Sequence, residues 1–180
     1  MPNDRYGKMI KTLQQKLGIK LLAIDFDKTF VDVHTRGLWL RDSTDLVNHV
    51  RPGVRSLIAN ALSANLRVCI VTFSSQVTLI SNVLKAALPE SEVSHVIVRG
   101  CSGDWDSDLN IGRCGKQHHL ASVIEELKEK DHMEVAFEQV MLIDDDVDNV
   151  DYARKDGCKA LLFVDDDSLK ELKSPKNFKR

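Results

Sequence analysis

The segment LLAIDFDKT at positions 21–29 constrains this chain more than any other. Four apolar residues are followed at once by two carboxylates, Asp25 and Asp27, with one residue between them. A short apolar run bounded by polar residues is typical of a strand buried on both faces. Ligands of open α/β sheets bind beyond the carboxyl ends of such strands. Because two acids there are costly unless they bind metal or transfer protons, we expect an active site that begins at Asp25.

Strand and helix patterns alternate along the rest of the chain. Apolar runs predict four further strands, at 68–71, 96–98, 140–143 and 160–164. Helical periodicity follows Pro52 and recurs around 77–88 and 120–127. Repeated strand–helix units require a mostly parallel sheet with helices on both faces. The sequence therefore predicts a three-layer, Rossmann-like α/β fold with a central parallel sheet of about five strands.

The amino-acid composition limits the class of protein, the kinds of partner and the cellular location that we expect. The chain has 180 residues, 43% of them hydrophobic and 29% charged, as in a soluble globular protein. A net charge of −2 gives no field that favours nucleic acid or an anionic membrane. No apolar stretch approaches the length of a membrane span. The four cysteines show no CxxC spacing, which favours a reducing, cytoplasmic location over a disulfide framework or a zinc site.

The chain is expected to form one domain over residues 1–180, with its core at about 18–168. Residues 30–46 are expected to form a flap beside the first strand. Residues 169–180 carry five cations against one acid, Glu171, and are expected to be a frayed, solvated basic tail. The oligomeric state cannot be inferred from these patterns.

Polar residues follow the predicted strands at several places. Thr72 and Ser74 follow the second strand, Lys116 opens the helix after the third, and Asp144, Asp145, Asp146 and Asn149 follow the fourth. In a parallel sheet all of these meet at one edge. A carboxylate nucleophile toward phosphorus needs a hard cation, a second carboxyl group, a hydroxyl and an ammonium. Those groups are available, in that order, from Asp25, Asp145, Asp27, Thr72 and Lys116.

These residues resemble the four motifs of haloacid dehalogenase (HAD) superfamily phosphatases. Asp25-Phe26-Asp27-Lys28-Thr29 matches the DxDxT motif, and Val71-Thr72 matches a strand that ends in Thr or Ser. Lys116 matches the helix-opening lysine, and the run from Leu142 to Asn149 resembles the acidic fourth motif. The resemblance extends from Leu21 to about Val164, nearly the whole chain.

The resemblance implies a role for each residue. Asp25 would be the nucleophile, forming an aspartyl-phosphate, and a Mg²⁺ ligand. Asp27 would be the general acid and base, and its backbone carbonyl would also bind the metal. Thr72 and Lys116 would hold the phosphoryl group, with Ser74 as the alternative hydroxyl. The second acid of the DxDxT motif favours phosphoryl chemistry with an alkoxide or phenoxide leaving group.

The fourth motif departs from the usual Gly-Asp pattern because it carries three consecutive acids, Asp144, Asp145 and Asp146. This leaves the register of the metal ligand open. Asp145 is favoured as the direct ligand, because Asn149 then falls where a second acidic or amide group is usual. Asp144 and Asn149 would hold metal-bound waters or orient Lys116.

Neither interval between the motifs has room for a full cap domain, so the chain resembles capless or minimal-cap members such as the magnesium-dependent phosphatases. Such open sites suit a phosphoprotein or another large phosphorylated substrate. A small-metabolite or nucleotide phosphatase is the alternative, and a catalytically silent interaction module on this fold is a further one. A receiver-type signalling domain would require a different order of acidic residues and lysine.

The flap and the motifs add candidate substrate-binding residues. The flap carries His34, Arg36, Trp39 and Arg41. Either this segment faces the substrate, with Arg36 gripping a second anion and Trp39 stacking on a ring, or Trp39 packs on the body and the charges are solvated. The substrate-binding candidates are Thr29, Ser74, Arg36 and Trp39. The loop 99–115 contains Trp105, Asn110 and Arg113, for which a structural role is favoured.

Overall fold

The chain folds around the predicted parallel sheet. The computed structural model describes residues 4–101 and 115–178. The strands within these residues are hydrogen-bonded in the order β3-β2-β1-β4-β5, and every neighbouring pair is parallel. Their bounds are Leu21–Ile24 (β1), Arg67–Val71 (β2), Ile97–Arg99 (β3), Val140–Asp144 (β4) and Lys159–Leu162 (β5). The predicted α/β class and sheet of about five strands are confirmed.

Helices connect successive strands. The α-helices of the described residues are Asp4–Lys11 (α1), Ser43–Val47 (α2), Pro52–Ser63 (α3), Val77–Ala87 (α4), Gln117–Asp131 (α5) and Val147–Lys155 (α6). Helical turns of the 3₁₀ and π types cover Thr12–Lys16, Phe26–Phe30, Val93–His95, Phe137–Gln139, Asp166–Lys173 and Pro175–Phe178. α3 begins with a proline, whose fixed φ suits the first turn of a helix.

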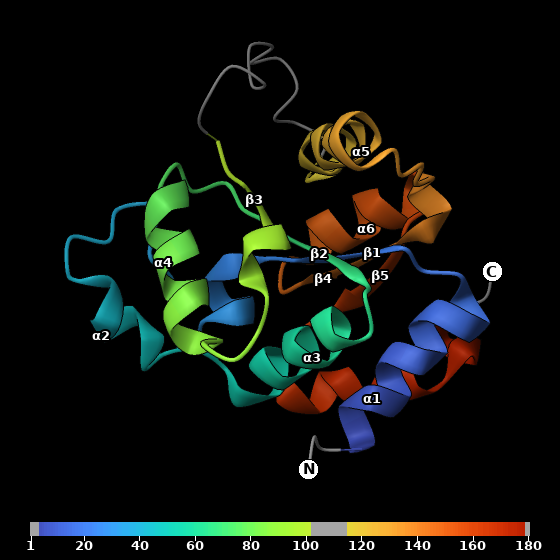
Figure 1. Cartoon of the computed structure of the whole chain (residues 1–180), viewed down its shortest axis with the longest axis horizontal. Coiled ribbons are helices and arrows are strands. Elements are labelled where there is room, and N and C mark those ends of the chain that lie inside the picture. The colour runs from blue at the N-terminus through green and yellow to red at the C-terminus, as the bar shows by residue number, and fades with distance from the viewer. Residues whose placement is uncertain (1–3, 102–114, 179–180) are drawn as a thin grey trace.

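Side chains of the strands alternate between two hydrophobic cores. In β1, Leu22 and Ile24 join the core that α1, α3 and α4 cover, whereas Leu21 and Ala23 join the core under α5 and α6. Figure 1 shows the sheet between these layers, with α5 and α6 on one face and α1 and α3 on the other. Because β1 is central and fully buried on both faces, all four of its residues must be apolar.

The expectation of a frayed basic tail is wrong. Leu169 and Leu172 of the helical turn Asp166–Lys173 are fully buried, and they pack into the same core as α1 and α3. The side chain of Asp166 accepts a hydrogen bond from the backbone N–H of Gly53, at 2.7 Å. Two leucines three positions apart lie on one face of a 3₁₀ turn, so they bury while the lysines between and beside them stay in solvent.

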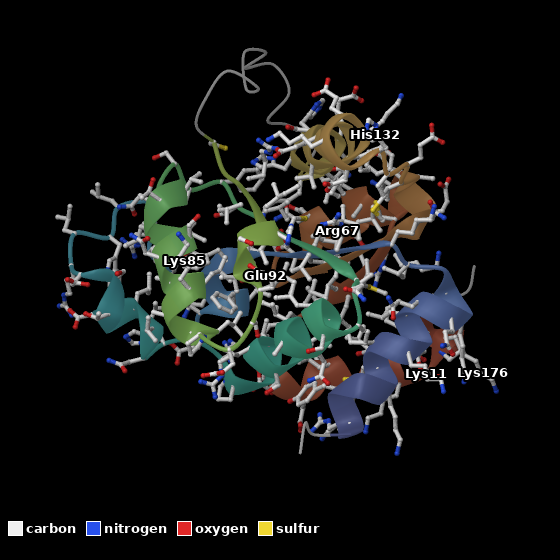
Figure 2. All side chains as sticks on the ribbon, in the orientation of Figure 1. Lys11, Arg67, Lys85, Glu92, His132 and Lys176 are labelled. Carbon is white, nitrogen blue, oxygen red and sulfur yellow. The ribbon has the colours of Figure 1, made fainter. Side chains whose placement is uncertain are left out.

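The core also reaches further toward the N-terminus than residue 18. Met9 and Leu13 are fully buried against the layer formed by α1 and α3. The N-terminal helix and the C-terminal segment pack together, and Figure 2 shows Lys11 and Lys176 at this same edge of the molecule. The predicted boundary of about 18–168 is therefore too narrow at both ends.

The flap segment lies between β1 and α3 in the chain. Val31 and Val50 form an isolated antiparallel bridge outside the sheet, and the short helix α2 lies between them. Trp105, Asn110 and Arg113 lie outside the described residues. A search of the described residues finds no helix with the length and hydropathy needed to span a membrane.

Candidate active site

The first motif forms a turn at the end of β1. Asp25 continues the sheet, since its N–H donates to the carbonyl of Ile143 at 2.9 Å. The chain then reverses within one wide turn, in which the N–H of Phe30 donates to the carbonyl of Asp25 at 3.2 Å. Lys28 occupies the left-handed region at φ 62°. This turn places both Asp25 and Asp27 at the carboxyl edge of the sheet, where both line one cavity.

Lys116 contacts residues at the ends of three central strands beneath that cavity. It caps the start of α5 and is 1% exposed. Its Nζ donates to Asp25 Oδ1, to Asp144 Oδ2 at 3.1 Å and to the carbonyl of Val71 at 2.9 Å. These partners follow or end β1, β4 and β2, respectively. The ammonium is therefore fixed by three strands and directed at the candidate nucleophile.

The three consecutive acids of the fourth motif have different surroundings. Asp144 is fully buried, and its carboxylate accepts from Lys116 and from Asn149 Nδ2 at 3.2 Å. Asp146 caps α6 by accepting the N–H of Asp148 at 2.8 Å. Asp145 is exposed, and its carboxylate accepts from Thr29 Oγ1, which also donates to Asp25. Oxygens of Asp25, Asp144 and Asp145 all lie within 4.8 Å of one another, so these three are the carboxylates the fold gathers.

Charge is not balanced within this cluster. Three carboxylates, those of Asp25, Asp144 and Asp145, surround the single ammonium of Lys116. Burial raises the pKa of Asp25 to about 7, with Lys116 opposing and Asp144 adding to the shift. Desolvation, and then Asp144, raises the pKa of Asp145. Burial lowers the pKa of Lys116, but the carboxylates of Asp25 and Asp144 outweigh it and the net shift is upward. The ammonium thus stays charged among excess negative charge.

The donor set fits a hard divalent cation. Mg²⁺ binds carboxylate and carbonyl oxygens together with water and phosphate, and this cluster offers carboxylate oxygens alone. Neutralising two negative charges would also remove the repulsion between carboxylates, which adds to the effect of burial in raising the pKa of Asp25 and Asp145. Asn149, buried at 6% exposure, supplies an amide beside Asp144.

Asp27 is held by the flap rather than by the cluster. Thr35 donates to its carboxylate twice, from the backbone N–H at 3.1 Å and from Oγ1 at 2.8 Å. His34 Nδ1 lies 3.1 Å from the second carboxylate oxygen. The carboxyl group is therefore fixed at the side of the cavity, at a distance from Lys116, which suits a separate chemical role.

The second motif supplies the opposite wall. Thr72 is 2% exposed, and its Oγ1 accepts the N–H of Ser74 at 3.1 Å. Ser74 Oγ in turn accepts the N–H of Gln76 at 3.1 Å. Phe73, which lies between Thr72 and Ser74 in sequence, lines the cavity and is 49% exposed, with Lys116 Nζ 5.1 Å from its ring centre. Thr72 and Ser74 both line the cavity, so neither hydroxyl is excluded by position.

The cavity has a volume of about 330 Å³. Of the predicted site residues, those that line it are Asp25, Asp27, Arg36, Thr72, Ser74, Lys116, Asp144, Asp145 and Asn149. Two candidates for substrate binding do not line it. Thr29 is fully buried, where Oγ1 donates to Asp25 Oδ2 at 3.3 Å and lies 3.4 Å from Asp145 Oδ1, so it orients carboxylates.

Trp39 is the other candidate that the cavity excludes. Its ring packs against the core and edge-on to His49, and its indole N–H donates to the carbonyl of Asp42 at 3.2 Å. Of the two interpretations of the flap, the packed one applies to Trp39, whereas Arg36 faces the cavity.

Sequence reasoning did not include Phe73 or Thr35 in the site. Phe73 could have been found, because it lies between two hydroxyl residues at a strand end and an aromatic there has no core to enter. Thr35 carries no sequence signal, since its bond to Asp27 depends on how the flap folds back.

No protein-family model matches the sequence, and no curated protein matches it. Similar solved structures include the HAD domain of effector protein Lem4 from Legionella pneumophila, with TM-score 0.48 and 11% identity over 79% of this chain and 83% of that one. A hypothetical protein from Xanthomonas campestris gives 0.48 and 13%, over 89% and 69%. A Vibrio cholerae protein assigned as a 3-deoxy-D-manno-octulosonate 8-phosphate phosphatase gives 0.45 and 15%, over 94% and 88%. Likeness at this level carries no information about activity.

Proposed function

We propose that this chain is a Mg²⁺-dependent phosphomonoester hydrolase of the HAD superfamily that works through an aspartyl-phosphate on Asp25. The observation that carries this proposal is the buried contact of Lys116 with Asp25 and Asp144 beneath a cavity whose side wall carries Asp27. The arrangement gives one carboxylate to a nucleophile, one to proton transfer and others to a cation. A catalytically silent module would have no use for the excess charge.

Asp25, Asp145 and the backbone carbonyl of Asp27 would hold the Mg²⁺, with Asp144 and Asn149 beside them. When bound, the cation would neutralise phosphoryl oxygens and the carboxylate excess described above. Lys116 and a hydroxyl of Thr72 or Ser74 would bind the remaining phosphoryl oxygens. The phosphoryl oxygens are already charged in the substrate. Lys116 and the hydroxyl group would therefore contribute mainly because they are held rigidly in position.

The chemistry then has two steps. A carboxylate oxygen of Asp25 attacks phosphorus, the bond from phosphorus to the leaving oxygen breaks, and the carboxyl proton of Asp27 passes to that oxygen. In the second step Asp27 accepts a proton from water, whose oxygen attacks phosphorus and releases Asp25 and inorganic phosphate. Thr35 fixes the Asp27 carboxyl group for both transfers, because it binds that group through two donors.

The form of the site favours a phosphate presented on a larger molecule, including a phosphoprotein. The cavity of about 330 Å³ lies at the small end of the range for ligand pockets, and the described residues contribute no cap domain that would enclose a larger molecule. The rest of a substrate would lie on the surface. A small phosphorylated metabolite would also enter the cavity. A panel of substrates distinguishes these two classes.

Hydrolysis of p-nitrophenyl phosphate tests the proposal, measured with Mg²⁺ and with EDTA for the wild type and for Asp25→Asn. We expect metal-dependent turnover that the substitution abolishes. Beryllium fluoride, which mimics an acyl phosphate, should form an adduct on Asp25 in the wild type alone. A folded wild type with neither turnover nor adduct would contradict the proposal. A positive result justifies a panel of phosphopeptides, nucleotides and sugar phosphates.

A further inference from the structure

The flap places one cation over the cavity by an unusual backbone turn. The N–H of Leu38 donates to the carbonyl of Thr35 at 3.1 Å, and the two residues between them have φ of 56° (Arg36) and 67° (Gly37). Positive φ at both central positions defines a type I′ turn, in which glycine, asparagine and aspartate predominate. Arginine at the first position is costly, and an outlier of this kind motivates a functional hypothesis.

The turn is fixed on both sides. Before it, Thr35 is bound to the carboxylate of Asp27. After it, Trp39 and Gln76 exchange two hydrogen bonds: Trp39 N–H donates to Gln76 Oε1 at 2.7 Å, and Gln76 Nε2 donates to the Trp39 carbonyl at 3.0 Å. Gly37 lies against Ser74, since a Cβ at that position would be 3.7 Å from the Cα of Ser74. The flap therefore holds Arg36 at a set position above the cavity.

The guanidinium of Arg36 belongs to an exposed residue of the flap. Among residues 4–101 and 115–178 it forms no ion pair, although it lines a cavity that contains carboxylates. Lys116, which also lines the cavity, is already paired because it binds Asp25 and Asp144. An exposed arginine with an open planar donor fork is suited to a carboxylate or phosphate from outside the chain.

The position of Arg36 also indicates which part of a substrate it would contact. It directly follows Thr35, which binds Asp27, the group that donates the proton to the leaving oxygen in the proposed mechanism. Lys116 lies instead with Asp25, where the phosphoryl group would bind. Arg36 thus belongs to the leaving-group side of the cavity.

We propose that Arg36 binds a second anionic group on the leaving alcohol, so that the substrates are phosphomonoesters whose alcohol carries a carboxylate or a further phosphate. This inference rests on the proposed function, and it names the chemistry that selects among phosphate esters. The same guanidinium chemistry serves both anions, and the substrate series below separates them.

Matched substrate pairs test the inference. The 3- and 4-carboxyphenyl phosphates are compared with the carbamoylphenyl phosphates of the same shape, and propane-1,3-diyl bisphosphate is compared with 3-hydroxypropyl phosphate. We expect kcat/KM to favour the charged member of at least one pair by about tenfold or more, through a lower KM and in a salt-sensitive way. The pair that shows the preference identifies carboxylate or phosphate as the second anion.

The variants Arg36→Gln and Arg36→Lys locate the effect. Arg36→Gln should bring the charged-to-neutral ratio close to one, and Arg36→Lys should restore part of it. Arg41→Gln is the matched control, because Arg41 is a nearby flap arginine that lies over the Trp39 ring at 5.9 Å and does not line the cavity. The ratio should be unchanged in Arg41→Gln.

Equal kcat/KM within every pair for an active wild type would overturn the inference and leave the hydrolase proposal intact. An equal loss on both members in Arg36→Gln would also overturn it, because Arg36 would then contact the phosphoryl group itself. Calorimetric titration of the Asp25→Asn protein with the same pairs gives a second readout that needs no turnover. If the protein proves inactive, equal affinities there would still refute the second-anion site.

Discussion

Two carboxylates in this molecule are bound in opposite ways. At the floor of the cavity, Asp25 shares one lysine with Asp144 and has Asp145 close by. On the face covered by α3, Asp166 accepts the N–H of Gly53 at the start of that helix, 2.7 Å away. The first carboxylate lies among like charges, whereas the second meets the positive end of a helix dipole.

The difference separates function from stability. A helix N-terminus matches a negative charge, so the Asp166 contact joins the C-terminal segment to α3 and contributes to folding. At the cavity floor, burial and the neighbouring acids raise the pKa of Asp25 to about 7, which means that the folded protein holds the ionised form at a cost. We expect this cost at a site where a bound ligand removes it. The following variants test the contrast between Asp25 and Asp166.

The largest effect is expected from Asp25→Asn. Turnover of p-nitrophenyl phosphate should fall by more than about a thousandfold, because the amide cannot act as the nucleophile. In the absence of Mg²⁺ the same variant should have a higher Tm than the wild type, since one of three crowded carboxylates becomes neutral while Lys116 keeps Asp144. Thermal unfolding with EDTA measures this. A lower Tm would mean that Asp25 stabilises the fold, and the contrast with Asp166 would fail.

Asp27→Asn should slow substrates in proportion to how poorly their alcohol leaves. Alkyl phosphates should lose about a hundredfold or more in kcat, whereas p-nitrophenyl phosphate, which needs little proton donation, should lose far less. Thr35→Val keeps the shape of the Asp27 partner without its hydroxyl, so it should give a smaller effect with the same dependence on leaving group. Equal losses on both substrates would remove the proton-transfer role from Asp27.

Asp145→Ala should raise the Mg²⁺ concentration required for half-maximal activity by about tenfold or more. Asp146→Asn is the control, since asparagine also caps helices and the Asp146 carboxylate serves α6. The control should keep the wild-type metal titration. If Asp145→Ala titrates like the wild type, the direct ligand is another acid of the triplet, and the division of roles read from their contacts is wrong.

Much of the fold and of this site follows from local sequence. The apolar run 21–24 and the acid at 25 fix a buried strand and its end, and the same logic places Thr72, Lys116 and the acids after β4 at one edge. The three acids of the fourth motif could not be separated in this way, because their sequence contexts are nearly the same. Their different contacts, with Lys116, with Thr29 and with the N–H of Asp148, arise from the three-dimensional fold.

What sequence reasoning missed depends on contacts between distant segments. Trp39 packs away from the cavity because Gln76, far along the chain, binds its backbone on both sides. The lysine content of the tail predicts a solvated segment, whereas the burial of Leu169 and Leu172 fixes its position against the core. Net charge describes a segment as a whole, but two buried leucines outweigh several solvated lysines in free energy.

Gly53→Ala tests the stabilising role of the contact between Asp166 and the start of α3. A Cβ at position 53 would lie 2.5 Å from Cγ of Asp166, so the carboxylate must move and its bond to the start of α3 is lost. We expect a loss of about 1–3 kcal/mol in the free energy of unfolding, measured with urea. Asp166→Asn, which keeps an acceptor and removes the charge, should cost less. Phosphatase kcat should be unchanged in both, and a matched fall in kcat would show that the two regions are coupled.

The smallest effect concerns His119, a buried neighbour of the cavity floor. Burial, and then the charge of Lys116, lowers the pKa of His119 from 6.5 to about 4. Between these two values the unfolded chain binds a proton that the folded protein does not, so stability is complete above pH 6.5 and falls as the pH drops toward 4. The contribution is at most about 1.4 kcal/mol per pH unit.

Urea unfolding at pH 7 and at pH 5 measures this dependence. His119→Gln should unfold with a smaller difference between the two pH values than the wild type does, because glutamine takes no proton. His118→Gln, a change at the half-buried neighbouring position, should keep the wild-type difference. If His119→Gln retains the full acid sensitivity, the loss of stability comes from the carboxylates instead. The pH dependence of stability would then arise from Asp25 and the neighbouring carboxylates, with no contribution from the imidazole of His119.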